Sequence, residues 1–96
     1  MRRSEAIDLL RRHRSEIAAH GVRALYLFGS TRRDEAGPDS DVDLFIDYEQ
    51  GFSLLDLVAV KEQIDEILGA RTDLTTRGGL HPVLRDDILR DAERVF

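Results

Sequence analysis

The stretch that decides the fold is residues 25–46, LYLFGSTRRDEAGPDSDVDLFI. It predicts an apolar strand, a tight turn at Gly29 and Ser30, a polar connection, and a second strand that carries Asp41 and Asp43. Side chains at positions i and i+2 of a strand project from the same face, so the two carboxylates are expected to point together. After the first strand, free backbone N–H groups and the Ser30 hydroxyl can hold a phosphate. The stretch therefore predicts a cation site beside a phosphate site.

The residues on either side of this stretch predict three helices. Apolar residues recur at helical spacing over residues 4–20, 52–68 and 82–96. Ser4 and Ser53 are suitable N-cap residues for the first two helices, and Gly21 and Gly69 are suitable residues to end them. We therefore expect helices laid on a sheet.

Three short segments predict the strands of that sheet. They are residues 22–28, 42–47 and 71–76, and the last of them carries Asp73 between uncharged neighbours. The predicted order is helix, strand, strand, helix, strand, helix. This order indicates an α/β (α+β) fold, in which helices pack against a small mixed sheet.

Length and charge narrow the classes of function. The chain has 96 residues, so we expect a single domain over residues 1–96 with no separate domain to bind a large substrate. No apolar run suits a membrane span or a signal peptide, so a cytoplasmic protein is expected. With no cysteine there is no disulfide or thiolate metal site. The net charge of -5 argues against direct binding to a nucleic-acid backbone and fits a basic protein partner or a metal-bound nucleotide.

Three acidic residues can form the cation site. If the strands that carry Asp41, Asp43 and Asp73 are neighbours, their carboxylates can converge on one face of the sheet. Like charges in one site demand neutralisation, and Mg²⁺ prefers carboxylate and phosphate oxygens. Two such ions can stabilise both the attacking and the leaving oxygen of a displacement at phosphorus. Three carboxylates are enough to hold two ions.

The acidic residues also have two simpler interpretations. Asp39, Asp41 and Asp43 can form a solvated turn and a charged edge strand, which is the commoner meaning of an isolated Asp-x-Asp. The adjacent Gly-Ser turn and the apolar flanks favour the functional interpretation instead. A calcium-binding EF-hand loop is disfavoured, because Leu44 occupies the position of the turn glycine and Gln50 that of the bidentate glutamate.

The spacing of these residues resembles a family signature. Gly29-Ser30, ten intervening residues and Asp41-Val42-Asp43 resemble the GSx10DxD signature of the DNA polymerase β-type nucleotidyltransferases, and specifically the minimal nucleotidyltransferases (MNT). The resemblance covers nearly the whole chain, because the order of elements and the later Asp73 also match the minimal domain.

The resemblance implies a reaction and a role for each matching residue. It implies transfer of a nucleoside monophosphate from an NTP, usually ATP, to a hydroxyl group, with release of pyrophosphate. Gly29 and Ser30 would hold the β- and γ-phosphates, and Asp41 and Asp43 would bind Mg²⁺. Asp73 would match the third carboxylate, which helps to bind the metal near the acceptor and to activate the acceptor hydroxyl.

The resemblance also implies a partner. Minimal proteins of this family are commonly antitoxins encoded with a HEPN-domain ribonuclease toxin, and some of them modify a tyrosine of that toxin with AMP. The implied acceptor is thus a protein, and a hetero-oligomer of toxin and antitoxin is expected.

The loop after the Gly-Ser turn departs from the family pattern. Many members read GSxARG, whereas this chain reads Gly-Ser-Thr-Arg-Arg-Asp over residues 29–34. Arg33 matches the usual arginine and suits contact with the triphosphate. Arg32 replaces alanine and is interpreted as a surface residue. Asp34 replaces glycine and is expected to reposition the loop.

Three hypotheses follow. The leading one is a Mg²⁺-dependent adenylyltransferase that acts on a partner toxin. The first rival is an antitoxin that neutralises its toxin by steric binding alone. The second rival is a nucleotidyltransferase for a small molecule or an RNA end, which the short chain and its acidic balance disfavour.

Overall fold

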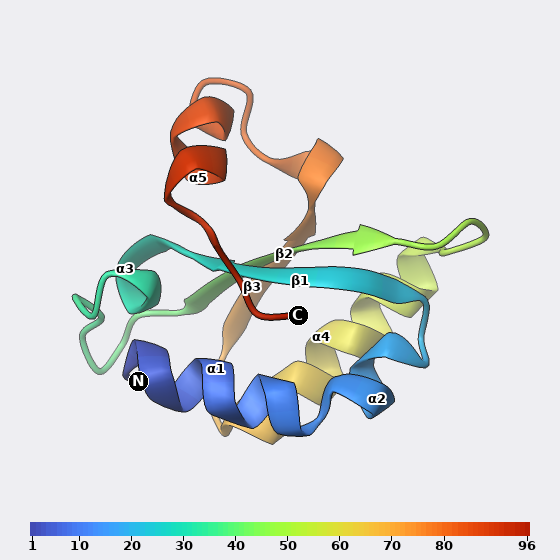
Figure 1. Ribbon diagram of the computed structural model, residues 1–96, viewed down its shortest axis with the longest axis horizontal. Coiled ribbons are helices and arrows are strands. Elements are labelled where there is room, and N and C mark those ends of the chain that lie inside the picture. The colour runs from blue at the N-terminus through green and yellow to red at the C-terminus, as the bar shows by residue number, and fades with distance from the viewer.

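The computed structural model describes residues 1–96, and its elements alternate between helices and the strands of one sheet (Figure 1). In chain order they are α1 (Arg3–Arg12), α2 (Arg14–Ala18), β1 (Val22–Phe28), α3 (Gly29–Arg32), β2 (Val42–Tyr48), α4 (Leu54–Leu68), β3 (Thr72–Thr76), the 3-10 turn η1 (Arg77–Gly79), α5 (Arg85–Asp91) and β4 (Glu93–Arg94). None of the helices combines the length and the apolar character needed to cross a bilayer.

The four strands form a mixed sheet in the order β3-β2-β1-β4. β1 pairs antiparallel with both β2 and β4, whereas β2 pairs parallel with β3. Parallel neighbours need a crossover, and α4 supplies it between β2 and β3. The predicted small mixed sheet with packed helices is therefore confirmed.

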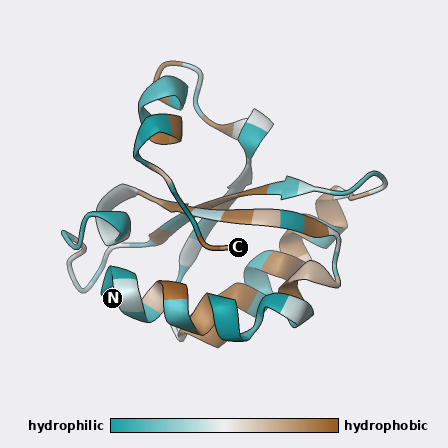
Figure 2. Ribbon diagram, viewed as in Figure 1, coloured by the Kyte–Doolittle hydropathy of each residue, from teal (hydrophilic) through white to brown (hydrophobic).

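One face of the sheet is covered by α1, α2 and α4, while α5 lies on the opposite side (Figure 1). Strand side chains alternate between the two faces, so every second residue of β1 and β2 enters the helical layer. Hydrophobic residues are concentrated where these strands meet α4 and α1 (Figure 2). The core joins both layers and includes Leu10, Ile17, Leu25, Leu27, Leu44, Ile46, Val60 and Ile64.

The helix α4 begins and ends as its sequence predicts. The Ser53 hydroxyl accepts from the Asp56 N–H at 3.3 Å, and the Asp56 carboxylate accepts from the Ser53 N–H at 2.8 Å. This capping box satisfies two backbone donors at the helix start. Gly69 follows the helix in the left-handed conformation, with φ +62°, which is the usual conformation of a glycine at this position.

The first predicted helix differs from the structure. Residues 4–20 form two helices that meet at His13, and Arg2 rather than Ser4 precedes the first of them, without a side-chain cap. The break lets the buried Leu10 and Ile17 both reach the sheet.

The last predicted helix also differs, because α5 ends at Asp91 and the chain then becomes extended. The Val95 N–H donates to the Leu25 carbonyl at 2.7 Å, and the Leu25 N–H donates to the Phe96 carbonyl at 3.0 Å. Val95 and Phe96 are buried, at 3% and 8% exposure. The open edge of β1 needs a hydrogen-bonding partner, and this requirement outweighs the helical pattern of residues 92–96.

Candidate active site

Two of the predicted acidic residues face each other across neighbouring strands. Asp43 of β2 and Asp73 of β3 are register partners in the parallel pair. Val42 and Leu44 are buried on the helical side, so Asp43 projects from the opposite face of the sheet. Burial raises the pKa of the Asp43 carboxyl, and the charges of Asp73 and Asp41 raise it further. The structure therefore brings negative charge together at this point.

Gly29 lies directly against this acidic pair. Phe28 is the register partner of Asp43 on β1, and Gly29 comes next in the chain. Its φ is +75°, in the region that favours glycine, and a β-carbon there would overlap the Asp43 carboxylate. α3 begins at this residue and includes Ser30. The turn predicted to hold phosphate therefore lies next to the Asp43 carboxylate.

Asp41 lies just outside the sheet. It precedes β2 by one residue, which agrees with the strand bounds predicted at 42–47 but not with the expectation that the strand carries Asp41. Its side chain is 45% exposed and forms an ion pair with Arg71, with 3.4 Å between Oδ1 and Nε. As the side chains lie, no three acidic or histidine residues form one metal-coordinating group. The expected convergence of Asp41, Asp43 and Asp73 is thus only partial, since Arg71 attracts Asp41 while the other two carboxylates repel it.

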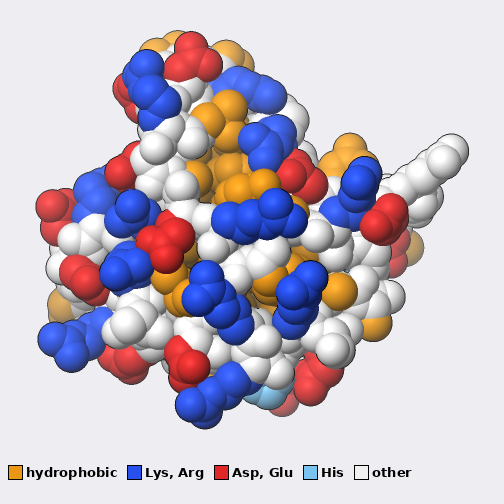
Figure 3. All heavy atoms as spheres, viewed as in Figure 1, with side chains coloured by type: hydrophobic (Ala, Val, Ile, Leu, Met, Phe, Trp, Pro, Cys, Tyr) orange, Lys and Arg blue, Asp and Glu red, His pale blue; other side chains and the backbone are white.

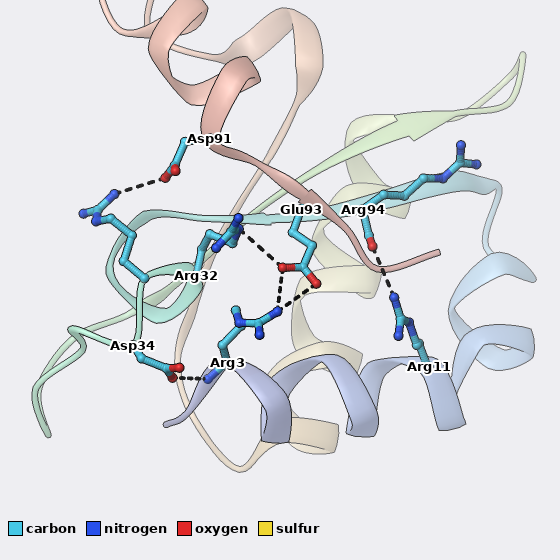
Figure 4. Close-up of polar contacts among 8 residues, drawn as sticks. Arg3, Arg11, Arg32, Asp34, Asp91, Glu93 and Arg94 are labelled. Carbon is cyan, nitrogen blue, oxygen red and sulfur yellow. Dashed lines mark hydrogen bonds and ion pairs between the residues drawn. The ribbon is translucent and has the colours of Figure 1, made fainter.

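A network of charged residues from both ends of the chain supports α3. Arg3 donates from Nη1 to both Glu93 carboxylate oxygens, at 2.7 and 3.0 Å, and Arg32 pairs with the same carboxylate at 3.4 Å (Figure 4). The Arg3 N–H also donates to Asp34 at 2.7 Å. The interpretation of Arg32 as a plain surface residue is therefore wrong, because its side chain joins α3 to β4 and α1.

Asp34 keeps the backbone conformation of the glycine that the resemblance predicts at its position. It is the one residue other than glycine with a positive φ, at +56°. Aspartate tolerates this region better than most residues. The bond from Arg3 helps to hold Asp34 in this conformation, so the chain closes the loop by a contact that glycine could not make.

Arg33 faces outward between two acidic partners. It pairs with Glu35 at 3.2 Å and with Asp91 of α5 at 3.4 Å, and its charge opposes the rise in the pKa of Asp43. A cavity of about 500 Å³ lies beside it, between α3 and α5, and is bordered by Phe28, Gly29 and Ile88. α5 therefore forms the outer wall of the space next to the Gly-Ser turn.

The sequence did not indicate Arg3 and Glu93 as parts of this site. They lie 90 residues apart in the chain, and the local sequence around each residue predicts an exposed polar position on or next to a helix. No spacing or composition signal links them. Only the pairing of β4 with β1 brings Glu93 over α3.

Comparisons with known proteins identify the family of the chain. A family model described as "Nucleotidyltransferase domain" matches residues 8–95. A candidate protein adenylyltransferase of Methanocaldococcus jannaschii is 42% identical over 77 residues, covering 80% of this chain and 83% of that protein. The protein adenylyltransferase MntA of Thermococcus cleftensis is 36% identical over 88 residues, covering 91% of this chain and 89% of that protein.

Solved structures with the same fold include proteins in toxin-antitoxin complexes. A candidate minimal nucleotidyltransferase superposes with a TM-score of 0.75 at 38% identity, covering 91% of this chain and 93% of that one. A toxin-antitoxin complex with AMP-PNP gives a TM-score of 0.70 at 18% identity, covering 100% of this chain and 73% of that one. An MNT antitoxin in complex with a tri-AMPylated HEPN toxin from Shewanella oneidensis gives 0.66 at 14% identity, covering 94% and 71%. At these last identities the likeness concerns the fold alone.

Proposed function

The chain belongs to the nucleotidyltransferase domain family, and from this membership we propose that it is an antitoxin that transfers AMP from ATP to a hydroxyl group of a toxin protein. The observation that carries the proposal is the contact of the Gly29 turn with Asp43, together with the register of Asp43 and Asp73. A phosphate-binding turn and paired carboxylates within one site are what transfer at phosphorus requires.

Asp41, Asp43 and Asp73 are the residues that would hold Mg²⁺, and Asp41 would first leave its ion pair with Arg71. The fit rests on their chemistry: the carboxylates are close enough that Asp73 and Asp41 raise the pKa of Asp43. Carboxylate oxygens are the protein ligands that Mg²⁺ prefers. Once bound, the metal supplies positive charge that neutralises the phosphate oxygens and favours displacement at phosphorus.

The residues of the chain have distinct tasks in the proposed reaction. Gly29 and Ser30 bind the β- and γ-phosphates through backbone N–H groups and the hydroxyl, and Arg33 adds a guanidinium on the outer side. Asp73, the exposed member of the pair, accepts the proton of the acceptor hydroxyl. The hydroxyl oxygen then bonds to the α-phosphorus, and the bond to the bridging oxygen breaks to release pyrophosphate.

The proposed acceptor is a tyrosine of a HEPN-domain ribonuclease toxin, bound in a hetero-oligomer. Support comes from relatives that carry the name protein adenylyltransferase and from a similar fold found with an AMPylated HEPN toxin. The exposed position of Asp73, at the edge strand β3, leaves room for a large acceptor beside the carboxylates.

Intact-protein mass spectrometry of the co-purified partner tests this function. The complex is incubated with ATP and Mg²⁺, using wild type, the Asp41→Asn/Asp43→Asn double variant, and Asp39→Asn as a matched control in the same exposed loop. We expect AMP units on the partner with wild type and the control, and none with the double variant. A stable complex that gains no AMP with wild type would instead favour neutralisation by steric binding.

A further inference from the structure

The face of the sheet opposite α1, α2 and α4 has acidic residues at one end and arginines at the other. Asp43 and Asp73 mark the acidic end. Asp47 projects from the same face of β2 four residues further on, about 13 Å away at roughly 3.3 Å per strand residue. Figure 3 shows basic side chains bordering hydrophobic ones over the strands below α5. The two ends of this face therefore differ in charge, and the arginine end contrasts with the net charge of -5 of the whole chain.

A cavity of about 600 Å³ occupies the arginine end. Its walls include Arg23, Arg77 and Arg94, with Asp47 as the acidic member and Tyr26 and Tyr48 as aromatic members. Three guanidinium groups thus face one carboxylate. The proposed transfer reaction assigns no task to any of these residues.

One of the arginines is a fixed wall of the cavity. Arg77 donates to both carboxylate oxygens of Asp47, at 2.8 and 2.9 Å, and lies over the rings of Tyr26 and Phe45 at 5.0 and 5.2 Å. Its charge is largely met by Asp47, because the bidentate pair matches the two groups well. Arg77 therefore shapes the cavity, and the other two arginines are left to bind an incoming group.

Arg94 forms no ion pair of its own, although its charge helps to lower the pKa of Asp47 in the same cavity. Its register places it opposite Tyr26 on β1, with the guanidinium 6.0 Å from the ring centroid, and it takes part in no ion pair. Figure 4 shows its side chain pointing away from the network around Glu93. Arg23 is held only loosely, by Glu49 at 3.7 Å, and both of those side chains are mostly exposed. Because Asp47 is the one carboxylate among three arginines in its lining, the cavity has an excess of positive charge.

The shape of the cavity favours carboxylate side chains over nucleic acid. Single-stranded RNA on a sheet face binds by stacking its bases on exposed aromatic rings. Here Phe45 is 1% exposed, and Arg77 covers both Phe45 and Tyr26. Tyr48 is 48% exposed, but its ring already stacks on Phe52, with 5.2 Å between the ring centroids. The guanidinium group of arginine can form two parallel hydrogen bonds with one carboxylate, and a cavity of this size holds a few side chains.

We propose that this cavity binds an acidic segment of the acceptor protein, two to four residues from the hydroxyl that receives AMP. The spacing follows from the register of the sheet. Arg94 is in register with Tyr26 and, through it, with Phe45, which lies about 7 Å along β2 from Asp43, and Asp47 lies about 13 Å from Asp43, at roughly 3.3 Å per extended residue. The proposal rests on the proposed function, because it takes the acceptor to be a protein. It adds that acidic residues near the acceptor hydroxyl determine which hydroxyl is selected.

Peptide binding without ATP tests this site separately from transfer. The probe is a fluorescein-labelled peptide with one tyrosine followed at the second to fourth positions by glutamate, and its control has glutamine there. We expect fluorescence anisotropy to give at least a tenfold lower Kd for the glutamate peptide, with the preference weakening as salt is added. In the Arg23→Gln/Arg94→Gln variant the preference should disappear, while Arg12→Gln, which removes an exposed arginine of α1 outside the cavity, should keep it.

Three results would overturn the proposal: equal affinity of wild type for both peptides, equal weakening by Arg12→Gln, or displacement of the glutamate peptide by a single-stranded oligoribonucleotide that binds more tightly. The first and third use only wild type, so they do not depend on the folding of a variant. Selective binding without AMP transfer to the co-purified partner would contradict the proposed function and leave an acidic-peptide site. Transfer without selective binding would contradict the cavity site alone.

Discussion

Gly29 and Asp43 are in such close contact that a β-carbon on the glycine would overlap the carboxylate of the aspartate. The contact joins the turn proposed to hold phosphate to the strand proposed to hold the metal. Because the two segments are 14 positions apart in the chain, neither can shift without displacing the other. Four predictions follow from this arrangement and from the ion pairs around it.

Replacing Gly29 with alanine should damage both the fold and the site. A left-handed backbone costs an alanine about 1–2 kcal/mol, and the collision with Asp43 adds to that cost. Gly69→Ala is the matched control, since Gly69 also has a positive φ but nothing within 4 Å of its β-carbon. Chemical unfolding should show a larger loss for Gly29→Ala, and AMP transfer should fall only in that variant. Equal losses in the two variants would contradict the close contact.

Replacing Asp43 with asparagine should raise stability while it removes activity. The pKa of Asp43 is raised in the folded chain, mainly by burial and then by Asp73, so the ionised form disfavours folding at neutral pH. That penalty disappears as pH falls below the unfolded value of about 3.9. Asp43→Asn should therefore have a higher Tm than wild type at pH 7, and the difference should shrink toward pH 3.

The same variant should lose about 100-fold or more of its transfer activity, because a charged group at the reacting centre is gone. Asp39→Asn, in the exposed loop nearby, should change neither Tm nor activity. A lower Tm for Asp43→Asn at pH 7 would show that the carboxylate stabilises the fold rather than serving the site.

The ion pair between Asp47 and Arg77 should stabilise the fold at neutral pH and lose this effect at low pH, whereas ionised Asp43 destabilises the fold at neutral pH. Hydrogen bonds from Arg77 hold the pKa of Asp47 below its ordinary value. The stabilisation is therefore complete above the unfolded pKa of about 3.9 and is lost as pH falls through the lower folded pKa. Asp47→Asn should cost roughly 1 kcal/mol at pH 7, since both side chains are partly exposed, and less at pH 3.

Urea unfolding across this pH range measures the effect. Asp8→Asn, which removes an exposed pair with Arg12, should change the free energy of unfolding by less than about 0.5 kcal/mol throughout. A constant difference between wild type and Asp47→Asn at every pH would contradict the assignment to ionisation of Asp47.

Replacing Glu93 with glutamine should weaken nucleotide binding more than it weakens the fold. Glu93 faces both Arg3 and Arg32, and without its charge the two guanidinium groups repel each other across α3. We expect the KM for ATP to rise several-fold, with a loss of about 1 kcal/mol or less in the free energy of unfolding. Glu16→Gln, which removes an exposed pair with His13, is the control. An unchanged KM for ATP would restrict Glu93 to a structural role.

The first three strands, the long helix α4 and the nearness of the Gly-Ser turn to Asp43 could be predicted because local signals agree there, whereas β4 was not predicted. The alternation of apolar and polar residues, the Ser53 cap and Gly69 each act over only a few residues. These elements therefore form without contacts from distant segments, and the local sequence predicts them. The helix over residues 82–96 was wrong for the opposite reason. Its apolar positions suit a helix equally well, and the open edge of β1 decides the outcome for Val95 and Phe96.

By itself, the sequence determined the order of most elements and the combination of a phosphate-binding type of turn with an acidic strand, because both depend on the spacing of residues close together in the chain. Tertiary structure alone decided that Asp43 and Asp73 share a register and that Asp41 turns to Arg71. It also placed Glu93 between Arg3 and Arg32 and set Arg94 over the Tyr26 ring without an ion pair. The physical reason is that charges act through space, and only the packed sheet brings residues from opposite ends of the chain within reach of one another.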